Sequence, residues 1–307
     1  MQNNESVYKL FRGIIKSMNK ITLTQQATDG QLLEVTFLPD QGMNLISLKK
    51  GNTEVIDQST WALFEERFAG LGALIGPHFH RRNAHVIPLM KDESLFPHIA
   101  RVKAKGVQDP FSHGIARYAP WKKEFDQTSV RAELKGKDEW NGVSLASLEG
   151  QDFKMNLHAD LKPNGLFLQL SVVSETASLV GIHYYYALKG KSHVVSKVQE
   201  KAFIENELKK IPSEWGFKEN HALMFDLERE ADYSFYPFPD VTKGEIILKT
   251  EDHSLKTTYE CSSSENCWQL YHPKGASFVC IEPISSKDPR HPNLTVSSLN
   301  IHLEIIQ

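Results

Sequence analysis

The sequence is poor in cysteine and has no long apolar run. Its three cysteines, Cys261, Cys267 and Cys280, are too few and odd in number for a disulfide framework, and they lack the paired short spacings of a zinc site. No apolar run approaches the roughly 18 to 20 residues that a membrane span requires, and residues 1–20 lack the apolar centre of a signal peptide. These absences favour a reduced, cytoplasmic location and predict no membrane partner.

No charge of one sign dominates the chain either. Lysine and arginine number 35 against 38 aspartates and glutamates, which gives a formal net charge of −3. This balance argues against a dedicated nucleic-acid-binding protein. No linker, repeat or low-complexity tract divides the 307 residues, so we expect one domain over residues 1–307, with residues 1–20 as an N-terminal arm. Nothing in the sequence singles out an oligomeric state.

Short apolar stretches separated by turn formers make up most of the chain after residue 20. The segment 153–161 alternates apolar and polar residues, as a strand with one solvated face does. The Pro-Asn-Gly sequence at 163–165 predicts a hairpin turn into the next strand, and Arg101–Ala104 is also expected to be a strand. Many short strands with frequent turns predict an all-β fold, a large antiparallel β-sandwich.

Helical signals are few. Trp61–Phe68 predicts one or two helical turns before Gly70. Glu200–Lys210 is rich in Glu, Lys, Ala and Leu and is followed by Pro212, which predicts a helix over this stretch. Neither segment is long enough to change the all-β class.

A carboxylate lies in the otherwise apolar stretch Phe278–Pro283, which predicts a short strand. In strand periodicity Cys280 and Glu282 share one face. An ionised carboxylate there is costly unless it is paired or its face opens on a cleft. For a single glutamate, a strand end that reaches solvent is the simpler explanation.

Two other stretches favour the cleft, because each brings a histidine into or beside an apolar run. They are Gly181–Leu188, which contains His183, and Ser112–Arg117, which contains His113. A lone histidine in a strand is often only a packed core residue. One strand carboxylate and two imidazoles together, however, form a set suited to general acid–base catalysis.

These stretches resemble the motifs of the aldose 1-epimerase (galactose mutarotase-like) family. The matching runs are His113-Gly114-x-x-Arg117 followed by Trp121, then Gly181-x-His183-x-Tyr185, and finally Phe278-x-Cys280-x-Glu282-Pro283. Their order and wide spacing are those of the family, and the resemblance runs from about Leu32 to the C-terminus. It implies a curved antiparallel β-sandwich with a sugar-binding cleft on one sheet.

The resemblance implies an isomerase that interconverts the α and β anomers of an aldohexose without a cofactor or a metal. Glu282 is then expected to take the proton of the anomeric hydroxyl, and His183 to protonate the ring oxygen. Glutamate suits the base because it is ionised at neutral pH, and histidine suits the acid because its reference pKa of about 6.5 lies near working pH. The expected partner is a small-molecule sugar or sugar phosphate.

The resemblance also implies substrate-binding groups. His113 and Arg81 are expected to hold sugar hydroxyls, and Asp226 is the candidate for a hydroxyl-binding aspartate. Trp121 and Tyr185 are expected to form aromatic walls for the sugar. The neighbouring Arg82 is an alternative to Arg81, because the family's loop pattern departs from the sequence here.

Three alternatives stay open. Arg81, Arg82 and two lysines at 122–123 suit a phosphate, which favours a hexose-6-phosphate 1-epimerase of the same fold. A catalytically silent carbohydrate-binding sandwich would share the fold without the activity. His78-x-His80 with His85 resembles the ligand spacing of a cupin metal site. No glutamate follows this pair before Pro88, and the flanking arginines repel a dication, so the metal site is the weakest of the three.

Overall fold

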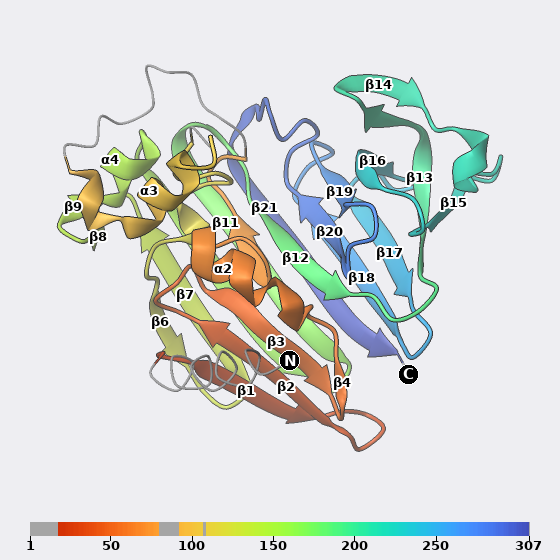
Figure 1. Cartoon of the computed structure of the whole chain (residues 1–307), viewed down its shortest axis with the longest axis horizontal. Helices are drawn as coiled ribbons and strands as arrows, with labels where there is room; N and C mark the ends of the chain where they lie inside the picture. The colour runs from red at the N-terminus through yellow and green to blue at the C-terminus, as the bar shows by residue number, and fades with distance from the viewer. Residues whose placement is uncertain (1–17, 80–91, 107–108, 307) are drawn as a thin grey trace.

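The computed structural model describes residues 18–79, 92–106 and 109–306 (Figure 1). Strands predominate in these segments, and every pairing between neighbouring strands in the two sheets below is antiparallel. The predicted hairpin is present, because the strand that begins at Phe153 ends at Lys162 and the next begins at Gly165. The predicted all-β class is therefore confirmed.

The first sheet carries the candidate site. In order of pairing its strands are β1 (Ile21–Gln26), β2 (Leu32–Leu38), β3 (Asn44–Lys50), β5 (Gly72–Ile75), β12 (Gly181–Ala187), β20 (Phe278–Ile284), β19 (Cys267–His272), β16 (Ala231–Pro237), β13 (His193–Ile204) and β14 (Glu207–Lys210), with β4 (Thr53–Glu54) beside β3. Strands β12 and β20, nearly a hundred residues apart in sequence, are neighbours here.

The second sheet packs against the first. In order of pairing its strands are β6 (Lys122–Phe125), β7 (Ser129–Lys135), β10 (Phe153–Lys162), β11 (Gly165–Ser178), β21 (Leu294–Ile306), β18 (Ser254–Cys261), β17 (Lys243–Lys249), β13 and β15 (Ala222–Asp226). The long strand β13 pairs with β17 near its start and with β16 further along, so it joins the two sheets. Buried side chains from both, such as Val35 and Leu168, form one apolar core, as a β-sandwich requires.

Short helices and a small hairpin cover the end of the sandwich near the site (Figure 1). They are α2 (Trp61–Arg67), α3 (Pro97–Lys103), α4 (Leu145–Glu149), the 3₁₀ turns η1 (Gln58–Thr60), η3 (Glu93–Leu95) and η4 (Ile115–Arg117), and the hairpin β8 (Glu139–Trp140) with β9 (Val143–Ser144). A further 3₁₀ turn, η5 (Ser213–Trp215), lies beside β15. The helix expected at Trp61–Phe68 is confirmed as α2. Within the described segments, no helix is long and apolar enough to cross a bilayer.

The strand expected at Arg101–Ala104 is wrong, because this stretch belongs mostly to α3. Pro97 occupies the first turn, where its missing N–H costs nothing. His98, Ile99 and Val102 are buried. Their spacing of one and four residues matches one face of a helix rather than a strand.

The helix expected at Glu200–Lys210 is also wrong, because this stretch is the hairpin between β13 and β14. Glu205 and Asn206 form its turn with φ values of 51° and 64°, the left-handed conformation that two-residue hairpin loops favour. Ala202 and Ile204 are buried and alternate with more exposed neighbours. Helix propensity is a weak preference, and here the pairing of a strand already anchored in both sheets overrides it.

Candidate active site

The site is built on neighbouring strands whose register brings distant residues together. Tyr185 on β12 lies opposite Cys280 on β20. His183 precedes Tyr185 by two residues, and Glu282 follows Cys280 by two. Because side chains two residues apart in a strand lie on the same face, His183 and Glu282 project from the same face of the sheet. The Nε2 atom of His183 lies 3.4 Å from the Oε1 atom of Glu282. The sequence predicted that these two side chains converge, and the structure brings them into contact.

A cavity of about 280 Å³ lies over this face, and His183 and Glu282 form part of its wall. The other charged and polar side chains around it include Arg67, His113, Arg117, Asp232, Gln269 and Arg290. Its volume is at the lower end of small-molecule pockets, which suits one sugar ring rather than an oligosaccharide.

A larger groove of about 890 Å³ lies over the second sheet, where Phe167, Tyr259 and His302 are among its lining residues. Among the described residues that line it, none forms a buried pair of a histidine and a carboxylate. Chemistry rather than size therefore identifies the smaller cavity as the candidate active site.

The acid–base pair is almost fully buried and incompletely hydrogen-bonded. Glu282 is 1% exposed and His183 is 7% exposed. Within the described part of the chain, Oε2 of Glu282 and Nδ1 of His183 have no hydrogen-bond partner. Buried polar atoms are almost always satisfied, because leaving one unpaired costs about 1–3 kcal/mol. Because both residues line the cavity, these atoms are candidates to pair with the polar groups of a ligand.

Burial shifts the protonation of both members of the pair. It raises the pKa of Glu282 well above its ordinary value of 4.5, although the Arg117 guanidinium opposes this shift. Burial also lowers the pKa of the His183 imidazole well below 6.5, and Arg117 adds to that effect. Both shifts favour the uncharged forms of the two side chains.

Arg117 was part of a matching motif, but sequence reasoning assigned it no role. It ends the 3₁₀ turn η4 and is 3% exposed. Its Nε donates to the carbonyl oxygen of Leu74 at 3.5 Å, while Nη2 has no partner among the described residues. A buried guanidinium keeps its charge, so Arg117 brings a positive charge close to Glu282. The spacing of the His-Gly-x-x-Arg run was the signal that pointed to it.

His113 lines the cavity as predicted, and a tight turn holds its ring. Its Nδ1 donates to the carbonyl oxygen of Phe79 at 2.6 Å, so Nε2 is the acceptor atom of the neutral ring. Its ring centroid lies 5.3 Å from that of His183. The next residue, Gly114, has φ 90°, and a Cβ there would lie 2.0 Å from the Gly76 carbonyl oxygen. Only glycine fits this close approach.

Tyr185 and Asp232 also lie at the cavity. The Tyr185 ring stacks on the His183 ring with centroids 4.9 Å apart and an interplanar angle of 12°, which agrees with the predicted aromatic wall. Asp232 on β16 lies opposite Tyr271 on β19, and Tyr271 lies opposite Cys280 on β20. This row across the sheet brings Asp232 to the cavity, and no sequence pattern pointed to this residue.

Trp121 and Asp226, two of the predicted substrate-binding residues, lie away from the cavity. Trp121 is buried in the core, and its indole N–H donates to the Ala116 carbonyl oxygen at 2.9 Å. Asp226 is exposed at the end of β15, where its carboxylate accepts the Glu228 amide N–H. A large apolar ring gains more from core packing than from a cavity wall, and Asp226 caps a turn. Arg81 lies outside the described residues.

The two lysines proposed as phosphate ligands do not extend this site. Lys122 and Lys123 are on β6, at the edge of the second sheet, and form ion pairs with Asp138 and Asp40. Neither lines the cavity. Arg82 lies outside the described residues, as do His80 and His85 of the cupin-like pattern.

One group of side chains has the composition of a metal site. His183, Cys280 and Glu282 each bring a possible ligand atom within 4.8 Å of the others. Burial raises the pKa of the Cys280 thiol and that of the Glu282 carboxyl group well above their usual values, so it favours the protonated form of both. A metal would have to displace both protons beside the charge of Arg117. The arrangement therefore suits proton transfer better than metal binding.

Comparison with known proteins identifies the fold. No family model and no curated protein matches the chain. Among solved structures, a galactose mutarotase-like protein from Lactobacillus casei matches with a TM-score of 0.63 and 13% identity, over 94% of this chain and 100% of that one. A galactose mutarotase-like protein from Clostridium acetobutylicum matches with a TM-score of 0.62 and 16% identity, over 93% and 98%.

A GalM/aldose epimerase homologue from C. elegans matches with a TM-score of 0.60 and 13% identity, over 95% of this chain and 100% of that one. Identities this low establish the fold and leave the activity to be argued from the site. The chain thus has the galactose mutarotase-like fold that its three motifs predicted.

Proposed function

We propose that this protein is an aldose 1-epimerase, which interconverts the α and β anomers of an aldohexose by opening and closing the sugar ring. The observation that carries the proposal is the 3.4 Å contact between His183 Nε2 and Glu282 Oε1 in the wall of a cavity. The neighbouring structures described as mutarotase-like or as an aldose epimerase homologue support it.

Mutarotation needs one group that accepts a proton and one that donates a proton. Ring opening removes a proton from the anomeric hydroxyl and adds one to the ring oxygen, and closure on the other carbonyl face reverses both transfers. A buried pair that holds one proton matches this requirement. Positioned acids and bases typically contribute about 10²–10⁴-fold each.

Glu282 acts as the base and His183 as the acid when the pair is in its charged form. This form arises from the uncharged pair, which burial favours, when the proton crosses the 3.4 Å contact from Glu282 to His183. The Arg117 charge favours the carboxylate of Glu282, and hydrogen bonds from sugar hydroxyls to that carboxylate favour it further. Substrate binding therefore prepares the catalytic protonation state.

The remaining cavity residues hold the sugar while its carbonyl carbon turns over. His113 presents an acceptor nitrogen, and Asp232 and Gln269 present polar groups from β16 and β19. Tyr185 supplies an aromatic wall beside His183. Arg81 remains a further candidate ligand for a hydroxyl group.

The test is an anomer-exchange assay by NMR or polarimetry that starts from pure α-glucose or α-galactose. We expect the protein to accelerate equilibration, and we expect Glu282→Gln and His183→Ala each to lose about 10²-fold or more of that rate. Asp226→Asn, at an exposed carboxylate away from the cavity, is the matched control and should keep full activity. Treatment with a chelator should leave the rate unchanged.

A protein that binds these sugars without accelerating their exchange would instead be a carbohydrate-binding sandwich. A folded Glu282→Gln variant with full activity would remove the proposed mechanism. Circular dichroism and a thermal melt of each variant separate loss of chemistry from loss of fold.

A sugar phosphate is the second candidate substrate, because two arginines, Arg67 and Arg290, line the cavity in addition to the acid–base pair. Arg67 has an Nε atom without a partner among the described residues. Guanidinium groups suit phosphate oxygens. If glucose 6-phosphate is the substrate, its kcat/KM should exceed that of glucose, and Arg290→Gln should lower the former selectively.

A further inference from the structure

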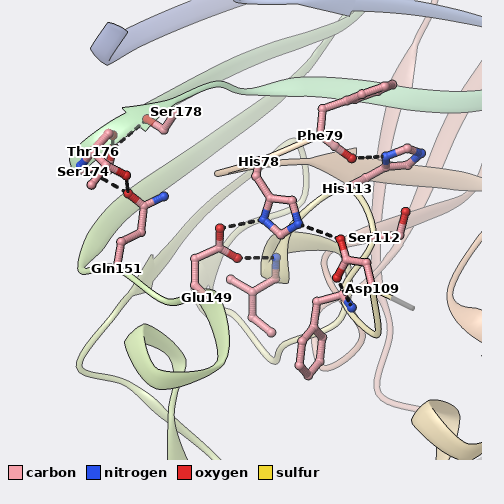
Figure 2. A network of polar contacts seen from close by, with 12 residues as sticks. His78, Phe79, Asp109, Ser112, His113, Glu149, Gln151, Ser174, Thr176 and Ser178 are labelled. Carbon is pink, nitrogen blue, oxygen red and sulfur yellow. Dashed lines mark hydrogen bonds and ion pairs between the residues drawn. The ribbon is translucent and has the colours of Figure 1, made fainter. Parts of the chain in front are cut away.

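A second buried histidine lies beside the cavity, between two carboxylates (Figure 2). His78 is 5% exposed and belongs to the loop that follows β5. Its Nδ1 lies 2.8 Å from Oε1 of Glu149, the last residue of α4, and its Nε2 lies 3.1 Å from Oδ2 of Asp109. His78 was the first histidine of the cupin-like pattern, but its two ring nitrogens face acidic oxygens.

The contacts between these three side chains bear on the charge of His78. An ionised carboxylate only accepts hydrogen bonds, so both ring nitrogens must carry a proton to satisfy both contacts. The other oxygen of each carboxylate is also used as an acceptor. Oε2 of Glu149 accepts the Ile115 amide N–H at 3.1 Å, and Oδ1 of Asp109 accepts the Phe111 amide N–H at 3.0 Å. The contacts therefore fit two carboxylates that flank one imidazolium.

This cluster supports the backbone of two cavity residues. Ile115 begins the 3₁₀ turn η4, which ends at Arg117, so the bond from Glu149 anchors the turn that carries the buried guanidinium. Phe79 follows His78 directly, and its carbonyl oxygen accepts both the Nδ1–H and the backbone N–H of His113. His78 and its two acidic partners thus connect the segment that holds His113 (Figure 2) with the turn that carries Arg117.

We propose that His78 is a positioning residue: as an imidazolium held by Asp109 and Glu149, it fixes His113 and Arg117 against the bound sugar. The inference rests on the proposed epimerase activity for its catalytic consequence, but its charge state and its structural effect are measurable without activity. A displacement of about 1 Å in a positioned group can cost about 10²-fold in rate, so the loss of this clamp should be visible in kcat/KM.

The first experiment needs no enzyme activity. Selective ¹⁵N labelling of histidine, with assignment of His78 by comparison with His78→Gln, reports the protonation of both ring nitrogens. We expect both to be protonated at pH 7.5. In Asp109→Asn, an amide group can donate to Nε2, so we expect Nε2 to lose its proton while Nδ1 keeps it.

The second experiment measures the effect on the site. In His78→Gln we expect faster hydrogen exchange of the Ile115 amide and a fall in kcat/KM of about 10²-fold. His253→Gln is the matched control, because His253 is also a buried histidine in contact with a carboxylate, Asp252, but lies in the β17–β18 turn away from the cavity. It should change neither quantity.

An unprotonated ring nitrogen on wild-type His78 at pH 7.5 overturns the ionic clamp. Full activity in folded His78→Gln, with unchanged exchange of the Ile115 amide, overturns the positioning role. If the wild-type protein has no epimerase activity at all, the proposed function fails while the nitrogen shifts and the amide exchange still decide the clamp.

Discussion

Replacing Glu282 with glutamine should make the protein more stable at neutral pH while it removes catalysis. The side chain keeps its shape and size, but it can no longer ionise. Glu282 is 1% exposed, and burial raises its pKa well above the ordinary 4.5. The folded protein therefore holds a proton that the unfolded chain releases above pH 4.5.

The direction of the effect follows from proton linkage. Between pH 4.5 and the raised pKa of Glu282, the folded state binds more protons than the unfolded state, so the free energy of unfolding falls as pH rises. The slope for one group is about 1.4 kcal/mol per pH unit. Glutamine does not titrate, so its free energy of unfolding lacks this pH dependence. The stability of the variant relative to wild type should therefore grow by about 1.4 kcal/mol for each pH unit across this window.

The titration of His183 changes stability with pH in the opposite direction, so its contribution must be separated from that of Glu282. Burial lowers its pKa well below 6.5, so stability rises with pH between the lowered value and 6.5. In the wild type the two slopes partly cancel between pH 4.5 and 6.5, and the net fall becomes visible only above pH 6.5. The difference between Glu282→Gln and wild type removes most of the His183 contribution.

The assay is urea unfolding of both proteins at pH 4.5, 6, 7 and 8, with anomer exchange measured on the same samples. Glu260→Gln, which removes an exposed carboxylate on β18, is the control for the loss of one negative charge. If Glu282→Gln is less stable than wild type at pH 8, or if the difference does not change with pH, then Glu282 is not held as a neutral acid and this account of the site is wrong.

Three further predictions follow from the same geometry. Arg117→Met removes the charge that favours the carboxylate of Glu282, so the pKa of Glu282 should rise further. The pH–rate profile should then move to higher pH, and kcat should fall by about 10-fold or more. Unchanged kinetics would exclude an electrostatic role of Arg117. Gly114→Ala should destabilise the fold by about 1–3 kcal/mol in urea unfolding, because its φ of 90° and the close carbonyl leave no room for a methyl group; a wild-type midpoint would contradict this. Asp232→Asn should raise KM for the sugar by about 5–10-fold with a smaller change in kcat, while Asp226→Asn should change neither, and equal effects of the two variants would remove Asp232 from the binding site.

Much of the fold was determined by local sequence patterns. The alternation in residues 153–161 and the turn formers at 163–165 specify a hairpin whose strands need no distant information to pair with each other. The apolar strand that contains Glu282 and the one that contains His183 were also visible, because a polar residue in an apolar run is conspicuous. The order of the motifs then predicted the galactose mutarotase-like fold.

Tertiary packing decided what local patterns could not. Glu200–Lys210 has the composition of a helix, but it became a hairpin because β13 was already paired in both sheets. Trp121 entered the core, where its indole N–H found a carbonyl oxygen. Register across the sheet brought Asp232 to the cavity and left Asp226 in solvent.

The tertiary structure also shifts the pKa values of the two groups in the site. The sequence supplied a glutamate and a histidine with ordinary reference pKa values near 4.5 and 6.5, and from these a base and an acid were expected. Burial raised the pKa of Glu282 and lowered that of His183, so it favours the uncharged form of each group. The sequence determined which two ionisable groups are available at this place in the sheet; desolvation in the folded chain determined the direction in which the pKa of each one moves.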